Sequence, residues 1–296
     1  MGPFQIGVGL CMAWAASQAP QHYERVVVTG TWQPAPVEEV DRTVRSLPVR
    51  SQLLTHSVWT DFVRLDPSLD LRARAPFAVQ GDLSIRGATF GQTLVLLDGM
   101  RLNDPQTGHH NLDLPLPMEM VSRIELLRGA GSTHYGADAV GGVVHLLTAP
   151  PEQSEFLLRA AFGQQGIQQQ RTLLSASRGN WSGQMAGARD FSSGFTPNRD
   201  YRNLSLAAAL WRESQAGPTH LLAAWNDRPF GASGFYGPFP SWERTRTWYA
   251  AGSQTVGRGR IAAAWRRHGD HFLLYRHQPE LYENRHRART WQASFR

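Results

Sequence analysis

Residues 83–148 carry the most informative pattern in the sequence, LSIRGATFGQTLVLLDGMRLNDPQTGHHNLDLPLPMEMVSRIELLRGAGSTHYGADAVGGVVHLLT. Its clearest local pattern is Gln92–Leu102 (QTLVLLDGMRL), in which two apolar runs flank Asp98-Gly99. This dipeptide accepts the positive φ angles of a two-residue turn, so the segment predicts a β-hairpin. A later cluster of glycines precedes the apolar segment Val143–Leu147 and predicts tight turns or close backbone contacts: Gly129, Gly131, Gly136, Gly141 and Gly142.

The rest of the first half has the texture of a small mixed domain. From about residue 24 to residue 150, short apolar runs alternate with Pro- and Gly-rich turns. Val58–Leu65 (VWTDFVRL) carries apolar residues at helical spacing and predicts a short helix. After Pro150-Pro151 the pattern changes to alternating strands, which places a domain boundary there.

Alternation of period two dominates the second half. Phe156, Leu158 and Phe162 share one face of a predicted strand, whereas Leu157 and Arg159 share the other. We expect about nine strands in this half, and the further ones lie near residues 181–191, 204–210, 220–225, 247–252, 260–265, 271–276 and 289–295.

The connections between these strands are alternately short and long. Gly179-Asn180 and Gly257–Gly259 predict short turns, whereas Ser192–Asn203 and Phe230–Arg244 are longer and rich in Gly, Pro and aromatic residues. Outer-membrane barrels have this layout, with short periplasmic turns and long extracellular loops. A soluble β-sandwich or propeller remains open as an alternative from pattern alone.

Composition excludes several classes of protein. The chain has 296 residues and a formal charge of +6, and its 30 basic residues, all arginine, are scattered among 24 acidic ones. That distribution argues against nucleic-acid binding. No apolar stretch of about 18 residues is present, which excludes a transmembrane helix but not alternating lipid-facing strands. The single cysteine, Cys11, offers neither a disulfide nor a thiolate for chemistry.

Residues 1–19 predict an export signal. An apolar run from Phe4 to Ala16 is followed by the small residues Ser17 and Ala19 at cleavage spacing. A lipoprotein reading of Cys11 is weaker, because bulky Leu10 precedes it.

Four motifs within residues 83–148 occur together in order: Leu83–Gly87 (LSIRG), Leu94–Arg101 (LVLLDGMR), Val121–Gly129 (VSRIELLRG) and Tyr135–Thr148 (YGADAVGGVVHLLT). Their order and spacing resemble the plug of TonB-dependent outer-membrane receptors, and they are most similar to the vitamin B12 (corrinoid) group, although siderophore receptors share much of the pattern. The positions matching the plug motif are Arg86, Gly87, Asp98, Gly99, Glu125, Arg128, Gly129, Tyr135, Gly136, Gly141 and Gly142.

The resemblance also covers a segment near the N-terminus. Glu24–Gly30 (ERVVVTG) resembles a Ton box, the segment that these receptors offer to TonB. Its residues would be Glu24, Arg25, Val26, Val27, Val28 and Thr29. A short Val-rich segment before a Pro-containing spacer suits pairing with a sheet edge, with Val26–Val28 carrying the pairing. The alternative is that these residues form the first strand of the plug.

The resemblance implies a fold and a domain order. It implies an α+β plug domain followed by an antiparallel transmembrane β-barrel in the cell outer membrane. The expected divisions are a signal at 1–19, Ton box and spacer at 20–36, plug at 37–150, and the N-terminal part of the barrel at 151–296.

Charged positions of the plug motif are expected to pair. Arg86, Glu125 and Arg128 could form buried or half-buried ion pairs within a polar barrel lumen, or could be ordinary surface charges. A phosphate cradle in the glycine-rich segment Arg128–Gly142 is disfavoured, because no lysine follows at Walker spacing and no dinucleotide fingerprint fits.

The implied function is energised uptake of a scarce nutrient, a corrinoid or a metal-siderophore. The implied partners are TonB with ExbB and ExbD, which deliver energy from the proton gradient, and outer-membrane lipid. Candidate ligand contacts lie in the apical plug loops and in the loop 230–242: Phe90, Asn103, Asn111, Phe235, Tyr236 and Trp242.

Nothing in the sequence predicts an enzyme or a cofactor. His109-His110 and His134 have no partner ligands at zinc spacing, so no metal site is assigned. Asp190 and Asp200 are too few for a calcium site. There is no Gly-x-Ser-x-Gly elbow and no convincing acid–base pair.

Barrels of this family have 22 strands, and about nine cannot enclose a plug. We therefore expect a truncated receptor or a fragment that does not transport by itself. Three hypotheses stay open at this point: an importer, a non-transporting binding or signalling protein of the same fold, and a soluble β-rich lectin or hydrolase.

Overall fold

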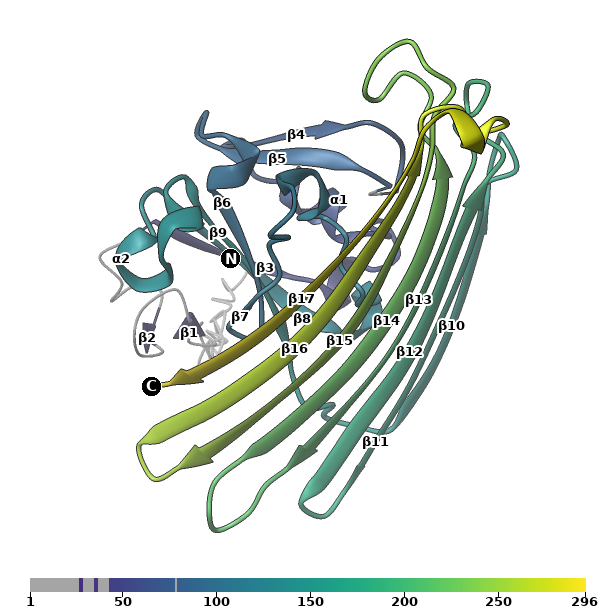
Figure 1. Cartoon of the computed structure of the whole chain (residues 1–296). Coiled ribbons are helices and arrows are strands. Elements are labelled where there is room, and N and C mark those ends of the chain that lie inside the picture. Colours follow the sequence, from purple (N-terminus) through teal and green to yellow (C-terminus); the bar gives the residue numbers. More distant parts are fainter. Residues whose placement is uncertain (1–26, 29–34, 37–42, 78) are drawn as a thin grey trace, which may run out of the picture.

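The structure is a computed structural model that describes residues 27–28, 35–36, 43–77 and 79–296. Two bodies are visible in Figure 1: a small mixed domain, and a long curved sheet whose concave side faces that domain. The predicted export signal and most of the predicted Ton box lie outside the described residues. Val27–Val28 (β1) belongs to the described part and pairs in antiparallel fashion with Ala35–Pro36 (β2).

A five-stranded sheet organises the small domain, in the order β3-β8-β9-β6-β7. Strands β6 and β9 are parallel, and the other neighbours are antiparallel. The strands are β3 (Val44–Pro48), β6 (Thr93–Leu97), β7 (Met100–Arg101), β8 (Val121–Arg128) and β9 (Gly142–Thr148). Both faces of β6 are buried, as expected of the continuous apolar run TLVLL.

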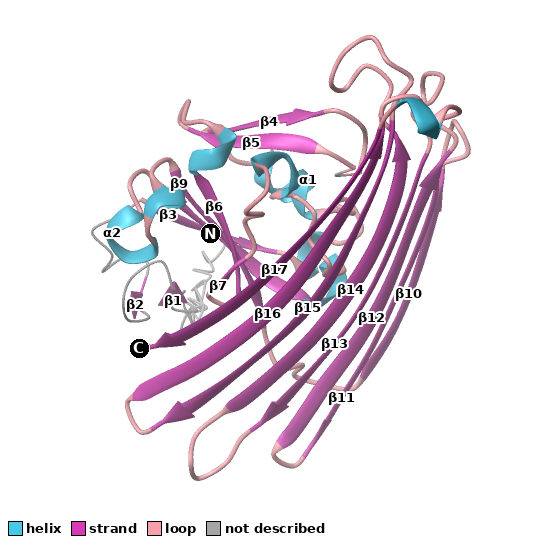
Figure 2. Ribbon diagram, in the orientation of Figure 1, coloured by secondary structure: helices cyan, strands magenta, loops and turns pink. Residues whose placement is uncertain are grey.

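Short elements cover this sheet (Figure 2). A separate two-stranded sheet pairs β4 (Leu69–Ala73) with β5 (Gly81–Ile85). The helices are α1 (Trp59–Val63) and α2 (Ser132–Tyr135), with 3-10 turns η2 (Arg50–Gln52), η3 (Phe90–Gln92), η4 (Gly108–His110), η5 (Met118–Met120), η6 (Ala137–Ala139) and, in the second half, η7 (Pro279–Leu281). None of the helices in the described part of the chain is both long and apolar enough to cross a bilayer.

Two local predictions are confirmed. Leu97 pairs with Met100 across a turn in which Asp98 and Gly99 have φ angles of 49° and 90°, as a hairpin turn with two left-handed residues requires. The expected helix in Val58–Leu65 is α1. It begins where the Asp61 side chain accepts hydrogen bonds from the backbone N–H groups of Ser57 and Val58.

The curved sheet is built from eight antiparallel strands, each paired with its neighbours in the sequence. They are β10 (Glu155–Phe162), β11 (Gln168–Arg178), β12 (Trp181–Ser192), β13 (Tyr201–Arg212), β14 (Thr219–Gly231), β15 (Trp242–Val256), β16 (Gly259–Leu273) and β17 (Glu283–Phe295). The sheet is a single layer that packs on the small domain instead of on a second sheet of its own, so the sandwich and propeller alternatives are wrong.

The described residues of the second half form eight strands, where about nine were expected. The segments predicted near 260–265 and 271–276 belong largely to one strand, β16, and Gln168–Arg178 was not predicted. Polar inward residues interrupt the apolar alternation in β16, and three glutamines open β11. Prediction from hydrophobic alternation therefore misses or divides strands whose inner face is polar.

The two faces of the sheet differ in polarity. Outward side chains are apolar and exposed, including Phe156, Leu158, Met185 and Leu206. Inward side chains are small apolar residues toward the short-turn end and polar residues toward the long-loop end, as Ala264, Arg266 and His268 illustrate in β16. Strands of outer-membrane barrels have this division between lipid and lumen.

The inward face and the small domain share one core. Leu173, Ala186, Ala209 and Tyr249 from the sheet belong to the same buried cluster as Ile124 and other residues of the plug sheet. The short turns predicted at Gly179-Asn180 and Gly257–Gly259 lie at one end of the sheet, and the longer connections lie at the other end (Figure 1).

Candidate functional site

Buried ion pairs join the small domain to the inward face of the sheet. Arg228 of β14 donates to Asp113 at 2.5 Å, and Arg266 of β16 donates to Asp104 at 2.8 Å. In the same way Arg159 of β10 donates to Glu119 at 2.8 Å. We call this contact between the loop 103–120 and strands β10–β16 the seam.

Backbone groups add to the seam. Arg228 also donates to the carbonyl oxygens of Val79 and Leu112, and Asn226 donates to that of Leu114. Burial would raise the pKa of Asp113, but the Arg228 guanidinium, assisted by the nearby histidines, outweighs it and holds the pKa below its usual value. The carboxylate is therefore charged, and a charged buried group needs its partner.

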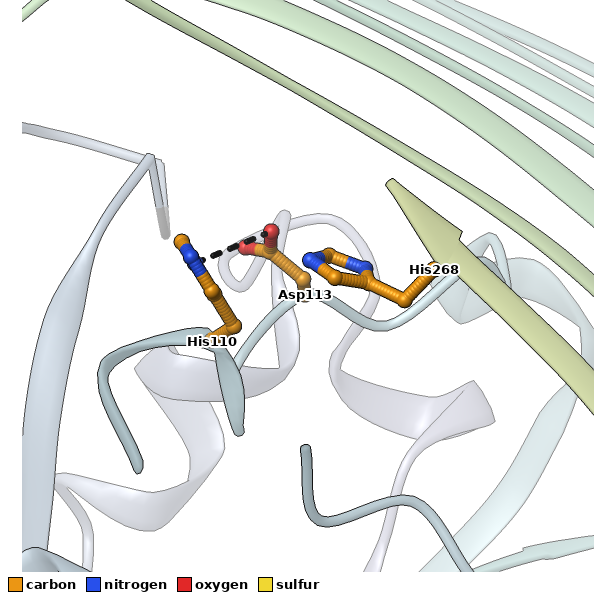
Figure 3. A group of neighbouring side chains, drawn as sticks. All are labelled: His110, Asp113 and His268. Carbon is orange, nitrogen blue, oxygen red and sulfur yellow. Dashed lines mark ion pairs between the residues drawn. The ribbon is translucent and has the colours of Figure 1, made fainter. Parts of the chain in front are cut away.

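Two imidazoles converge on Asp113, as Figure 3 shows. His110 and Asp113 come from the loop 103–120, and His268 comes from β16. Their candidate ligand atoms all lie within 4.8 Å of one another, and all three residues are buried. A second trio, His110, Glu243 and Asp270, shares the same imidazole and satisfies the same distance limit.

At the long-loop end, aromatic and cationic groups from both bodies meet. The ring of Phe90 stacks on His109 at 4.7 Å between centroids, and His109 lies 6.4 Å from the ring of Tyr236. Arg74 lies 5.3 Å from the Tyr236 ring, and Arg199 lies 4.3 Å from that of Phe235. Phe90, His109, Phe235, Tyr236 and Arg74 form what we call the apical cluster.

Polar bonds position the apical cluster. His109 contacts Asp82 at 2.6 Å through Nδ1, and the Tyr236 hydroxyl donates to Glu243 at 2.8 Å. Burial, followed by the charge of Glu243, raises the pKa of the Tyr236 phenol, so the hydroxyl remains a donor. Flat rings beside guanidinium groups are suited to a ligand with conjugated or anionic parts.

Three of the predicted ligand contacts lie elsewhere. The Asn103 side chain bonds to the backbone of Thr93 and Val95, and that of Asn111 bonds to the backbone of Asp104 and Phe90. Trp242 precedes inward-facing Glu243 in β15, and its ring packs on outward-facing His271. Of the six predicted contacts, the structure therefore brings Phe90, Phe235 and Tyr236 together.

The charged plug-motif residues have different environments. Arg128 pairs with buried Asp66, and Glu125 is buried and pairs with Arg123 at 2.9 Å. Arg86 is exposed and has a φ of 52° in the turn with Gly87. Burial would raise the pKa of Asp66, but hydrogen bonds from Ser68 and Arg128 lower it overall.

The motif glycines and Tyr135 lie where the backbone is constrained. Gly87, Gly99, Gly129, Gly136 and Gly142 all have positive φ. A Cβ at Gly141 would meet that of Ala88 at 2.5 Å. Tyr135 ends α2 and packs against a small apolar cluster that includes Leu94 and Leu127.

Sequence reasoning did not identify most of the seam. Asp104, Asp113, Arg228 and His268 of the seam were not singled out, and neither was Arg74 of the apical cluster. A partial signal was available, because charged residues occupy inward positions of otherwise alternating strands. That pattern gives the face of a residue but not its partner.

Comparison with known proteins agrees with the resemblance to a receptor plug. Residues 52–143 match the family model for the TonB-dependent Receptor Plug Domain. Two curated relatives, both vitamin B12 transporters BtuB of Vibrio vulnificus, are 28% identical over 144 residues (strain YJ016) and 25% identical over 254 residues (strain CMCP6). These alignments cover 47% and 83% of this chain but only 23% and 39% of the relatives, so the chain spans less than half their length.

Solved structures agree on the fold. The Pseudomonas aeruginosa receptor FpvA, in complex with a pyoverdine and iron, has a TM-score of 0.68 at 16% identity, covering 83% of this chain and 36% of its own. The ferric yersiniabactin uptake receptor FyuA of Yersinia pestis has a TM-score of 0.60 at 16% identity, covering 78% and 41%. Residues 52–143 thus match the plug domain of TonB-dependent receptors, the antiparallel strands that follow are similar in fold to the barrels of such receptors, and the chain is similar in sequence to vitamin B12 transporters.

Proposed function

We propose that this chain forms the plug and part of the wall of an outer-membrane receptor that imports a corrinoid using energy delivered by TonB, ExbB and ExbD. The observation that carries the proposal is the seating of the plug on the inward face of a sheet, through apolar packing and buried ion pairs, while the outward face of that sheet is apolar and exposed. An arrangement of this kind suits a gate in a membrane wall better than a soluble binding protein.

The ligand class rests on two supports. The curated relatives are vitamin B12 transporters, whereas the siderophore receptors resemble this chain at 15–17% identity, which bears on fold alone. The apical cluster supplies flat rings and guanidinium groups at the long-loop end, where a ligand arriving from outside would make contact. Phe90, Phe235 and Tyr236 are the contacts that we propose.

In this proposal TonB delivers its energy by binding the segment Glu24–Thr29. Val27–Val28 already makes a two-residue ladder with Ala35–Pro36. Exchange of this short ladder for pairing with an edge of TonB would use the same backbone groups. Such an exchange needs little free energy, since only two residue pairs separate.

The test is uptake of labelled cyanocobalamin by cells that express the full-length protein and lack their own corrinoid receptor. We expect accumulation that stops when TonB is deleted and when Val27→Pro removes a backbone donor. Val27→Ile is the matched control and should retain uptake. If the cells accumulate a ferric siderophore but not cyanocobalamin, the proposed ligand class is wrong. If the protein binds cyanocobalamin without TonB-dependent accumulation, it is a surface binding protein and not an importer.

The ligand contacts have a separate test. Tyr236→Ala should weaken cyanocobalamin binding to the detergent-solubilised protein by about tenfold or more, because a buried aromatic contact contributes on the order of 1–3 kcal/mol. Trp242→Ala removes a ring of similar kind from the outward face and should leave affinity unchanged. Equal losses in the two variants would place the ligand elsewhere.

A further inference from the structure

The seam brings together two imidazoles and a carboxylate that belong to separate bodies. His110 and Asp113 lie on the loop 103–120 and His268 lies on β16, so the group exists only when the plug is seated (Figure 3). Two imidazole nitrogens and one carboxylate oxygen are ligands that zinc and similar divalent ions prefer.

The spacing within this trio exceeds that of a hydrogen bond. His110 Nδ1 lies 3.8 Å from Asp113 Oδ2, which is beyond the usual limit of about 3.2 Å for a nitrogen–oxygen hydrogen bond. Two ligands bound tetrahedrally at about 2.1 Å from one metal ion lie about 3.4 Å apart. A shift of a few tenths of an ångström would therefore bring the pair to the separation that a shared metal ion requires.

Two polar atoms of the trio are buried without a hydrogen-bond partner among the described residues. Asp113 Oδ2 and His268 Nε2 make no hydrogen bond of normal geometry within the described residues. The other oxygen of Asp113 accepts from Arg228, which leaves Oδ2 directed toward the histidines. Buried polar atoms without partners are costly, so such a pair points to a bound species that completes their coordination.

A hydrogen bond with the neighbouring strand orients the His268 ring. Its Nδ1 lies 3.0 Å from the hydroxyl of Thr247 on the neighbouring strand. When Nδ1–H donates to this hydroxyl, Nε2 carries the lone pair and can bind a metal ion. Zinc-binding histidines usually have a second hydrogen bond of this kind.

Charge around the trio also favours a cation. Four buried carboxylates occur in this region, Asp104, Asp113, Glu243 and Asp270. Within the described residues their arginine partners are Arg228 and Arg266. Burial and the neighbouring Asp270 raise the pKa of Glu243 well above its usual value, which favours its neutral form. The three other carboxylates against two arginines then leave a formal excess of one negative charge, which favours a bound cation.

We propose that His110, Asp113 and His268 bind one divalent transition-metal ion of the zinc type at the seam between plug and barrel wall. The trio with Glu243 and Asp270 is the weaker candidate, because Glu243 Oε2 already accepts from Tyr236 and Asp270 Oδ2 contacts Gln106 and His286. The ion ties the loop 103–120 to β16, and withdrawal of the plug breaks the site. This inference does not depend on the identity of the transported ligand.

The experiment uses the full-length protein in detergent, stripped with a chelator and titrated with Zn²⁺ against a chromophoric competitor, and separately with Co²⁺. We expect one tight equivalent of Zn²⁺ and the visible absorption bands of Co²⁺ in a site of low symmetry. His268→Gln should weaken binding by more than about 100-fold, and Thr247→Val, which removes only the supporting hydroxyl, by about 10- to 100-fold. Both effects should appear in the Co²⁺ bands as well as in affinity.

His277→Ala is the matched control, because His277 is an exposed histidine in the connection after β16. It should leave binding unchanged. The proposal is overturned if the unaltered protein binds neither ion tightly, or if His277→Ala removes the tight equivalent while His268→Gln does not. Should His268→Gln fail to fold, as judged by circular dichroism, Thr247→Val decides: affinity equal to that of the unaltered protein contradicts the site.

Discussion

At the scale of single residues, His145 is a buried imidazole that the plug keeps neutral. Its Nε2 accepts a hydrogen bond of 2.8 Å from the backbone N–H of Gly99. Burial, with a contribution from Arg296, Arg123 and Arg260, lowers the pKa of His145 from 6.5 to about 3. Between these two pH values the unfolded chain takes up a proton at this position and the folded chain does not.

Plug stability should therefore fall as the pH is lowered from about 6.5 toward 3. From pH 6.5 to pH 5 the loss is on the order of 2 kcal/mol in the free energy of unfolding. His145→Gln keeps an acceptor for Gly99 but cannot be protonated, so its urea midpoint should depend less on pH. His277→Gln changes an exposed histidine and should keep the original dependence; a steep dependence that survives in His145→Gln would contradict the assignment.

Gly142 occupies a position where the backbone and its surroundings admit only glycine. It has a φ of 151°, and a Cβ there would meet the carbonyl oxygen of Leu127 at 2.3 Å. Gly142→Ala should destabilise the plug by several kcal/mol, since the clash is with backbone. Gly87→Ala is the control with positive φ and open space, and should cost about 1 kcal/mol. The rate of proteolysis of the plug in detergent measures the stability of both variants. Equal rates for Gly142→Ala and Gly87→Ala would show that the clash at residue 142 is relieved.

At the scale of elements, the hairpin β6–β7 is held by more than its turn. The Asp98 carboxylate accepts from both the backbone N–H and the hydroxyl of Thr148, each at 2.9 Å, which ties the turn to the end of β9. Asp98 also has a positive φ, which aspartate tolerates better than alanine.

Asp98→Ala should therefore cost about 2–3 kcal/mol, from two lost hydrogen bonds and the left-handed backbone. Asp98→Asn keeps an acceptor and the same backbone tolerance, so it should lose less than half of that. Hydrogen exchange at the amides of residues 93–101 and 146–148 reports the loss. Faster exchange in Asp98→Asn than in Asp98→Ala would be inconsistent with this account.

Elements also show where sequence patterns were sufficient. The hairpin, α1 and most strands of the curved sheet were predicted, because turn chemistry and periodicity are local properties. The pattern failed at β11 and β16, whose inner faces carry glutamine, arginine and histidine. Those positions face a plug instead of an apolar core, and a polar contact surface erases the alternation on which the prediction depends.

At the scale of the whole molecule, the plug is held to the wall by buried charge as well as by apolar packing. The Glu119 side chain is fully buried, and its partner Arg159 reaches it from β10. Removing one member of a buried pair leaves an uncompensated charge, which costs about 3–5 kcal/mol.

Arg159→Ala should accordingly loosen the plug, with increased hydrogen exchange at residues 117–121. Arg72→Ala removes one member of the exposed pair with Asp70, where at most about 1 kcal/mol is at stake, and should leave exchange unchanged. Glu119→Gln in the Arg159→Ala background should recover part of the loss, since the neutral amide needs no counter-charge. Without that recovery, the effect would have to come from lost packing.

Local conformations and the resemblance to a receptor plug follow from the sequence: the Asp98-Gly99 turn, the glycines with positive φ, and the alternation that separates two faces of each strand. Which polar groups meet depends on the packing of the plug against the sheet. Arg228 and Asp113, or His110 and His268, belong to different bodies, and no spacing along the chain relates them. Periodicity fixes the direction in which a side chain points, whereas the curvature of the sheet and the seating of the plug fix what lies opposite it.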